Sequence, residues 1–118
     1  MKFQVLLFAL AQLLKVSSLT NKEFKKRIAN VHVRLLFRTR DGQTGRLIVF
    51  DRGKIRSFPG AEHSYDAALV FKDAATGFSV MKSREKDAMF NAAAQGDMYL
   101  LGMSAWAVWL EDVMKLVM

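Results

Sequence analysis

The 118-residue sequence contains no cysteine and only one proline. Without cysteine the chain cannot form a disulfide framework, a thiolate metal site or a thiol nucleophile, and this composition is typical of the reducing cytoplasm. A single proline favours continuous helices and strands joined by short links. We therefore expect a cytoplasmic domain, peripheral at the membrane, whose stability comes from a hydrophobic core.

Histidine is also scarce, with two residues in the chain. His32 lies near arginines on a predicted strand and His63 lies beside Glu62 in a predicted loop, so neither has the i, i+4 partner of a helical metal site. Glu111 and Asp112 are adjacent on a predicted helix, where neighbours point about 100° apart. The glycines are too dispersed for a phosphate-binding loop. We therefore expect no enzyme activity, no cofactor and no metal.

Acidic residues are outnumbered, 11 against 18 basic ones, which gives a net charge of +7. Such a chain attracts anionic membranes, nucleic acid and acidic proteins. The candidate membrane or polyanion surface consists of Lys22, Lys25, Lys26, Arg27, Arg34, Arg38 and Arg40. These cations form either a plain solvated surface or a binding patch. Nucleic acid is disfavoured, because Phe37, Phe50 and Phe71 alternate onto the apolar face instead of standing between the cations as a stacking platform.

Hydrophobic residues make up 52% of the chain and begin at its start. An apolar stripe at helical spacing predicts an amphipathic helix over residues 1–16 that packs on the core; it consists of Phe3, Leu6, Leu7, Leu10 and Leu14. Ala9-Leu10-Ala11 also imitates the cleavage site of a secretory signal. The apolar stretch continues past that site, which favours the core helix, and the run Val5 to Leu14 is too short to span a bilayer.

A second, basic helix is predicted directly after the first. Thr20 precedes Glu23 by three residues, which is the pattern of a capping box. Ser17, Ser18, Thr20 and Asn21 all offer caps for a helix that carries the first group of lysines, and Thr20 is the candidate with the capping-box pattern.

Four stretches alternate in hydrophobicity as strands do. Val31 to Arg40 is followed by the turn Asp41-Gly42, and the returning strand Arg46 to Asp51 places Ile48 and Phe50 on the same face as Leu35 and Phe37. Leu36 is the exception, an apolar residue on the cationic face. Further strands are predicted at Lys54 to Phe58 and Ala67 to Lys72.

The second half of the chain is mainly helical. Asp73 can cap a short helix through Met81, in which Gly77 costs about 1 kcal/mol relative to alanine. An alanine-rich helix then ends at Gly96, a strand spans Met98 to Leu101, and Ser104 opens a last helix. The order predicts one α+β domain over residues 1–118, with a five-stranded, mainly antiparallel sheet and helices packed on one face.

The closing segment resembles the sterol carrier protein type 2 family. The resemblance rests on Phe90, on Gly96-Asp97-Met98-Tyr99-Leu100-Leu101-Gly102 and on the amphipathic terminal helix. Asp41-Gly42, Phe50-Asp51-Arg52-Gly53-Lys54-Ile55 and Tyr65-Asp66-Ala67-Ala68-Leu69-Val70-Phe71 agree with it. The chain departs from the family in carrying Asp97 and Met103 where basic and polar residues are common. The resemblance implies an apolar tunnel between sheet and helices.

It also implies a non-catalytic lipid carrier for a fatty-acyl, isoprenoid or sterol-like ligand, with residues 104–118 as a lid helix. The ligand-binding residues would be Leu35, Phe37, Ile48, Phe50, Leu69, Phe71, Phe78, Met81, Met89, Phe90, Met98, Leu100, Trp106, Trp109, Leu110, Val113 and Met114. An apolar lipid and an anionic membrane surface are the expected partners. The alternative is an accessory or scaffold protein, for example in lipid or quinone biosynthesis, whose apolar helices bind a protein partner or form a homodimer.

Overall fold

A computed structural model describes residues 2–82, 88–103, 105–114 and 116, with side chains left undescribed at 2, 81, 82, 88–90 and 107. The elements in chain order are α1 (Lys2–Thr20), α2 (Lys22–Ile28), β1 (His32–Thr39), β2 (Gly45–Asp51), β3 (Lys54–Pro59), β4 (Ala67–Phe71), α3 (Ala74–Lys82), α4 (Ala88–Ala94), β5 (Met98–Gly102) and α5 (Ala105–Met114).

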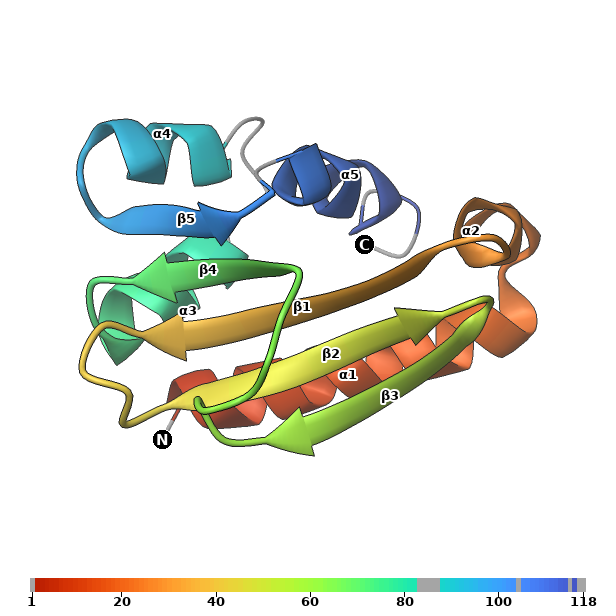
Figure 1. The fold of residues 1–118 in the computed structure, drawn as a ribbon, viewed down its shortest axis with the longest axis horizontal. Helices are drawn as coiled ribbons and strands as arrows, with labels where there is room; N and C mark the ends of the chain where they lie inside the picture. Colours follow the sequence, from red (N-terminus) through yellow and green to blue (C-terminus); the bar gives the residue numbers. More distant parts are fainter. Residues whose placement is uncertain (1, 83–87, 104, 115, 117–118) are drawn as a thin grey trace.

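The strands form one sheet in the order β3-β2-β1-β4-β5. β1 and β4 are parallel, and the other three neighbouring pairs are antiparallel. In Figure 1 the link from β3 to β4 crosses in front of β2 and β1, whereas α1 lies behind β2 and β3. A parallel pair requires such a crossover. The predicted α+β class, with a five-stranded mainly antiparallel sheet and helices on one face, is confirmed.

The strand register confirms the predicted apolar face. Leu35 pairs with Ile48, and Val33 pairs with Phe50, so their side chains point to the same side of the sheet. All four are fully buried in one hydrophobic cluster. Because side chains alternate along a strand, Arg34 and Arg38 belong to the opposite, outer face.

The main core lies between this face and the helices. α1 contributes Phe3, Leu7 and Leu14 to it, and α2 contributes Phe24 and Ile28, all at most 1% exposed. α1 packs across β2 and β3 and against α3. The predicted stripe of the first helix is therefore part of the core, in agreement with the core-helix interpretation.

The junction between α1 and α2 differs from the prediction. α1 continues to Thr20 instead of ending near residue 16. The Thr20 hydroxyl donates to the Val16 carbonyl at 3.0 Å, and the cap of α2 is Asn21, whose Oδ1 accepts from the Phe24 amide at 3.1 Å. Of the predicted cap candidates Asn21 is the cap, and the Thr20 capping box is wrong, because the Thr20 hydroxyl is satisfied by the carbonyl four residues earlier within its own helix.

Leu36 is explained by a second, smaller cluster on the outer face. Leu36, Leu47, Ala68 and Val70 are buried there together. The β3–β4 link crosses this face in Figure 1 and packs closely against the start of β2, where a Cβ added at Gly45 would lie 2.7 Å from the Ala61 Cα. The crossover therefore covers apolar residues that the helices do not reach.

Gly77 in α3 is also explained by close packing. A Cβ at this position would lie 2.7 Å from Cζ of Phe3, whose ring meets Phe71 edge-on at a centroid distance of 5.4 Å. The missing side chain thus makes room for an aromatic ring of α1. Helix propensity alone did not reveal this role.

The closing segment follows the predicted order. Gly96 has φ +80 after α4, and β5 pairs antiparallel with β4 before α5 begins at Ala105. The predicted Ser104 cap, the end of the last helix and the charged stretch 83–87 lie wholly or partly outside the described residues.

Candidate apolar ligand site

Most of the predicted ligand-binding residues meet in the main core cluster. Each comes from the helix-facing side of a strand or from the inner side of α5. The buried members are Leu35, Phe37, Ile48, Phe50, Leu69, Phe71, Met98, Leu110 and Val113. The fold therefore brings together these residues of β1, β2, β4, β5 and α5, and Ile55 extends the same apolar surface onto β3.

A second group of predicted residues lies at the border of this cluster. These residues are partly buried and pack against the fully buried ones; they are Phe78, Leu100, Trp106, Trp109 and Met114. The side chains of Met81, Met89 and Phe90 lie outside the described residues. The partly buried residues around α5 form what we call the α5 border, namely Leu100, Trp106, Trp109 and Met114.

The two tryptophans of α5 stack edge-on. The Trp109 ring lies 5.1 Å from Phe50 and 5.4 Å from Trp106, at interplanar angles of 90° and 87°. Such T-shaped pairs are favourable by about 0.5–1.5 kcal/mol beyond their buried area. The tryptophans thus connect the middle of the sheet to the α5 border.

α5 is held at two kinds of contact. Leu110 and Val113 are fully buried. The Nδ2 of Asn21 donates to the Leu116 carbonyl at 2.9 Å, which joins the chain after α5 to the α1–α2 junction. A substitution that tests α5 as a lid must leave the core intact. Leu110 is fully buried, so an arginine there would disrupt the core, whereas Trp106 is only partly buried and is the better position for the test.

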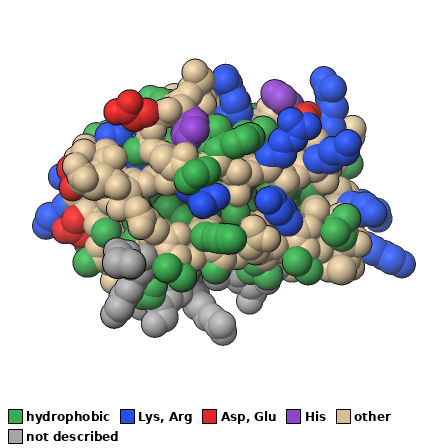
Figure 2. Space-filling view, turned by 90° about the horizontal axis from the view of Figure 1, so that it is seen from below, with side chains coloured by type: hydrophobic (Ala, Val, Ile, Leu, Met, Phe, Trp, Pro, Cys, Tyr) green, Lys and Arg blue, Asp and Glu red, His purple; other side chains and the backbone are tan. Residues whose placement is uncertain are grey.

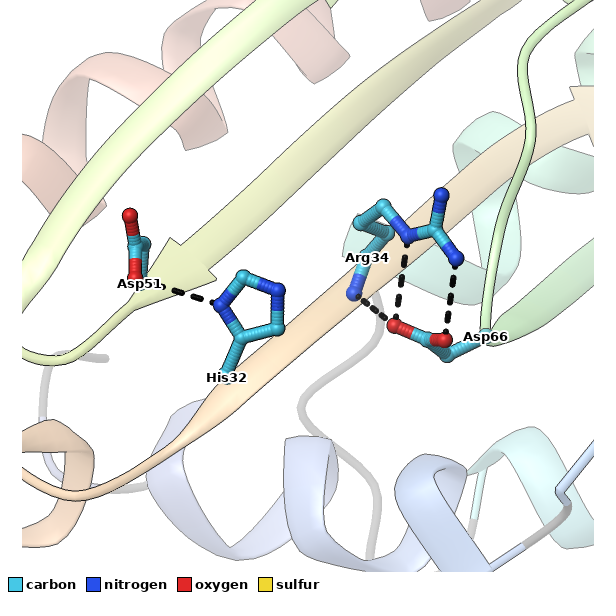
Figure 3. Close-up of polar contacts among 4 residues, drawn as sticks. All are labelled: His32, Arg34, Asp51 and Asp66. Carbon is cyan, nitrogen blue, oxygen red and sulfur yellow. Dashed lines mark hydrogen bonds and ion pairs between the residues drawn. The ribbon is translucent and has the colours of Figure 1, made fainter.

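Two pairs of charged or polar side chains on the outer face of the sheet link neighbouring strands (Figure 3). Asp66 accepts from the Arg34 backbone amide at 2.8 Å and from its guanidinium at 3.2 and 3.4 Å. The Arg34 side-chain hydrogen bond holds the pKa of Asp66 below its ordinary value. This pair fixes the start of β4 beside β1.

A second pair occupies the end of the same face. His32 Nδ1 lies 3.2 Å from the Asp51 carboxylate, and this hydrogen bond lowers the pKa of Asp51. His63 contacts the Pro59 carbonyl at 2.8 Å instead of Glu62. Within the described parts of the chain, no group of three or more His, Asp or Glu side chains is placed to hold a metal ion.

The structure divides the predicted cationic surface into two. Lys22, Lys25, Lys26 and Arg27 are exposed on α2, next to the end of α1. The arginines of β1 and its following turn lie on the outer sheet face and are engaged there: Arg34 with Asp66, Arg38 with the Thr39 carbonyl at 3.0 Å, and Arg40 with the Gly96 carbonyl at 2.8 Å.

Several exposed apolar residues were missed from the sequence. Tyr99 is 42% exposed beneath the guanidinium of Arg40, 5.4 Å from its ring centroid. Exposed aromatic residues therefore do occur beside cations, contrary to the alternation argument. On α1 the outward residues Val5, Phe8, Leu13, Val16 and Leu19 are also exposed. Their spacing of three to five residues was the available signal.

Together these features define a small two-layer α+β domain, in which a mixed sheet carries a helical layer over one apolar face. No family model and no curated protein matches the chain by sequence. Solved structures do match it by shape. UbiJ-SCP2, a ubiquinone synthesis protein, superimposes with a TM-score of 0.74 at 11% identity, covering 97% of this chain and 96% of that one.

The crystal structure of sterol carrier protein 2 gives a TM-score of 0.61 at 19% identity, covering 92% of this chain and 93% of that one. The stereoselective inverting sec-alkylsulfatase Pisa1 from Pseudomonas sp. gives 0.54 at 13% identity, with 78% of this chain matching only 14% of that one. The chain therefore has the sterol carrier protein 2 fold, as the sequence resemblance predicted. At these identities the likeness concerns the fold.

Proposed function

We propose that this domain is a non-catalytic lipid carrier that holds an apolar ligand between its sheet and its helices. The fold it shares with sterol carrier protein 2 supports lipid binding. The α5 border carries the proposal, because large apolar side chains gather there that are neither fully packed nor free in solvent. A ligand that completes their burial gains about 25 cal/mol per Å² of apolar surface.

The ligand would be a fatty-acyl, isoprenoid or sterol-like molecule. The cluster that faces α5 is built from aliphatic, aromatic and methionine side chains. Among the described residues, every buried side-chain nitrogen or oxygen already has a hydrogen-bond partner. Selection would therefore depend on the length and shape of the ligand more than on a polar head group.

α5 would act as the lid of this site. Its inner side is anchored by Leu110 and Val113, while its tryptophans lie at the border. A movement that turns Trp106 and Trp109 away from Phe50 would open the apolar face without exposing α1. The cationic exterior would bring the carrier to anionic membranes of the cytoplasm, where each basic residue near the surface contributes about 1 kcal/mol.

Tryptophan fluorescence tests the proposal directly, since Trp106 and Trp109 are the two tryptophans of the chain. A brominated fatty acid bound beside them would quench their emission in a saturable manner, and an unbrominated fatty acid would reverse the quenching by competition. Trp106→Phe and Trp109→Phe variants would show which ring lies nearer the ligand. Emission that stays unchanged at saturating brominated lipid would contradict the proposal.

A second candidate is an accessory protein that presents a lipophilic intermediate to enzymes of lipid or quinone biosynthesis. The similarity to UbiJ-SCP2, a ubiquinone synthesis protein, favours it. In this case the apolar helices would also bind a protein partner or a second copy. Sedimentation at micromolar concentration without lipid separates the two: self-association favours the accessory role, and a monomer that binds lipid favours the carrier.

A further inference from the structure

α5 is attached to the rest of the domain differently at its two ends. At its start the Met103 amide donates to the Asp66 carbonyl at 3.2 Å, and the Trp106 amide donates to the Met103 carbonyl at 3.1 Å. Gly102 has φ +78, and a Cβ at this position would collide with the Asp66 carbonyl oxygen. Backbone contacts and close packing therefore fix the start of α5 to the beginning of β4.

The far end of α5 is held by a side chain. The Nδ2 of Asn21 donates to the Leu116 carbonyl at 2.9 Å, and these two residues lie 95 positions apart in the sequence. We call this hydrogen bond the α5 latch. Figure 1 shows α5 running from the end of β5 toward α2, so the latch lies at the opposite end of the helix from Met103. A hydrogen bond of this kind shifts an equilibrium by about three- to tenfold, which is small enough for it to break and re-form.

Asn21 serves two elements with the two ends of its amide group. Its Oδ1 accepts from the Phe24 amide at 3.1 Å and thereby caps α2, while its Nδ2 forms the α5 latch. The cap orients the side-chain amide, because its oxygen can accept a hydrogen bond and its nitrogen can only donate one. A single side chain thus connects the end of α5 with the start of α2.

Opening at the latch would uncover the proposed ligand site. Val113 of α5 is fully buried, and Leu116 packs on the main core. A rotation about Gly102 moves the far end of α5 through the greatest distance, so the gap widens toward α2. Phe24 and Ile28 of α2 belong to the same buried cluster, and they would border the opening together with the sheet.

We propose that Asn21 is the positioning residue that controls lipid exchange. Its amide holds α5 closed, Gly102 and Met103 form the hinge, and the ligand enters and leaves between α5 and α2. This inference rests on the proposed lipid carriage. Because the latch stabilises the closed lid with and without lipid, its loss raises the rates of uptake and release together and leaves the dissociation constant nearly unchanged.

Asn21→Asp separates the latch from the cap. Aspartate caps a helix as well as asparagine does, and its charge suits a helix N-terminus. Figure 2 shows lysines and arginines gathered at the end of the molecule where α2 lies, and these cations also favour a carboxylate there. At neutral pH, however, aspartate has no donor for the Leu116 carbonyl. Asn21→Ala removes both contacts, so its unfolding midpoint should fall further than that of Asn21→Asp.

Stopped-flow fluorescence measures the exchange. Protein loaded with a brominated fatty acid is mixed with an excess of the unbrominated fatty acid, and the recovery of tryptophan emission gives the release rate. Asn21→Asp is expected to release the probe about three- to tenfold faster than the wild type, with affinities equal within about twofold. Thr20→Ala is the matched control, since its hydroxyl bonds the Val16 carbonyl within α1, and it should release the probe at the wild-type rate.

Hydrogen exchange followed by mass spectrometry tests the latch without any lipid. A helix as short as α5, with 10 residues, is marginal once it leaves the sheet, so its amides exchange when the lid opens. In Asn21→Asp the peptide that covers α5 should exchange about three- to tenfold faster than in the wild type. Peptides from α2 and from β1 should exchange at unchanged rates.

Two results would overturn the latch. The first is equal lipid release and equal α5 exchange in the wild type and Asn21→Asp. The second is faster exchange that is as large in α2 as in α5, because the substitution would then act through the cap. Failure of the lipid carriage gives a different result: the wild type would bind no brominated fatty acid, while hydrogen exchange would still decide whether Asn21 holds α5.

Discussion

Replacement of Gly77 by alanine tests the packing of α1 on α3 most sharply. In an isolated helix this change would stabilise the protein by about 1 kcal/mol. Here the new Cβ would lie 2.7–3.0 Å from three ring carbons of Phe3, and Phe3 is 1% exposed and packed edge-on against Phe71. Overpacking of this kind costs about 1–3 kcal/mol. The free energy of unfolding should therefore fall by up to about 2 kcal/mol.

A double-mutant cycle with Phe3→Leu supplies the control. In the Phe3→Leu background the smaller side chain relieves the collision, so Gly77→Ala should be neutral or should raise the free energy of unfolding by up to about 1 kcal/mol. Urea unfolding followed by tryptophan fluorescence measures all four proteins. A coupling energy of about 1–3 kcal/mol is expected. If Gly77→Ala has the same effect with phenylalanine and with leucine at residue 3, the packing argument is refuted.

Three further changes test other parts of the structure. Asp66→Asn removes the carboxylate whose pKa is lowered by Arg34. The stabilisation from this carboxylate is present above its unfolded pKa of about 4 and is lost as pH falls, so the variant should be about 1 kcal/mol less stable at neutral pH and should lose less stability in acid. Urea titrations of both proteins at several pH values measure this, and parallel pH dependences would contradict it. Gly96 and Gly102 both have positive φ, which costs any other residue about 1–2 kcal/mol. Gly102→Ala should destabilise the protein more than Gly96→Ala, because only at residue 102 would the new Cβ also collide with the Asp66 carbonyl oxygen. Equal unfolding midpoints of the two variants would argue against that contact. Trp106→Ala should leave the fold intact and reduce uptake of brominated fatty acid, measured by quenching of the remaining tryptophan, and undiminished uptake would remove Trp106 from the site.

The sheet and its apolar face were predictable because alternation fixes them locally. Once Leu35 and Phe37 share a face and Asp41-Gly42 turns the chain, Ile48 and Phe50 must follow on that face. Leu36 broke this alternation for a reason that no local pattern contains: it is buried with Leu47, Ala68 and Val70 of the two neighbouring strands, on the face that the β3–β4 link crosses. Likewise, Gly77 acquires its role only from Phe3, which is far away in the sequence.

The candidate site was predictable in part for the same reason. The residues on strands and on the inner side of α5 share periodic patterns, and they meet in one cluster. Exposure was harder to predict, because an apolar residue at helical spacing carries no label for which layer it faces. The predicted stripe correctly places Phe3 in the core, but Val5 and Leu19 of the same helix lie outside the stripe and are equally apolar; their exposure follows from the placement of α1 on β2 and β3.

Lipid carriage itself is tested most directly by what the purified protein contains. Protein prepared without detergent would be extracted with organic solvent, and the extract analysed by mass spectrometry, before and after incubation with a lipid mixture. We expect a single class of apolar lipid at a near-stoichiometric ratio, and its identity would separate a fatty-acyl, isoprenoid or sterol-like ligand. An extract that remains empty after the lipid mixture was offered would mean that the helices close over a filled core, and it would contradict the account.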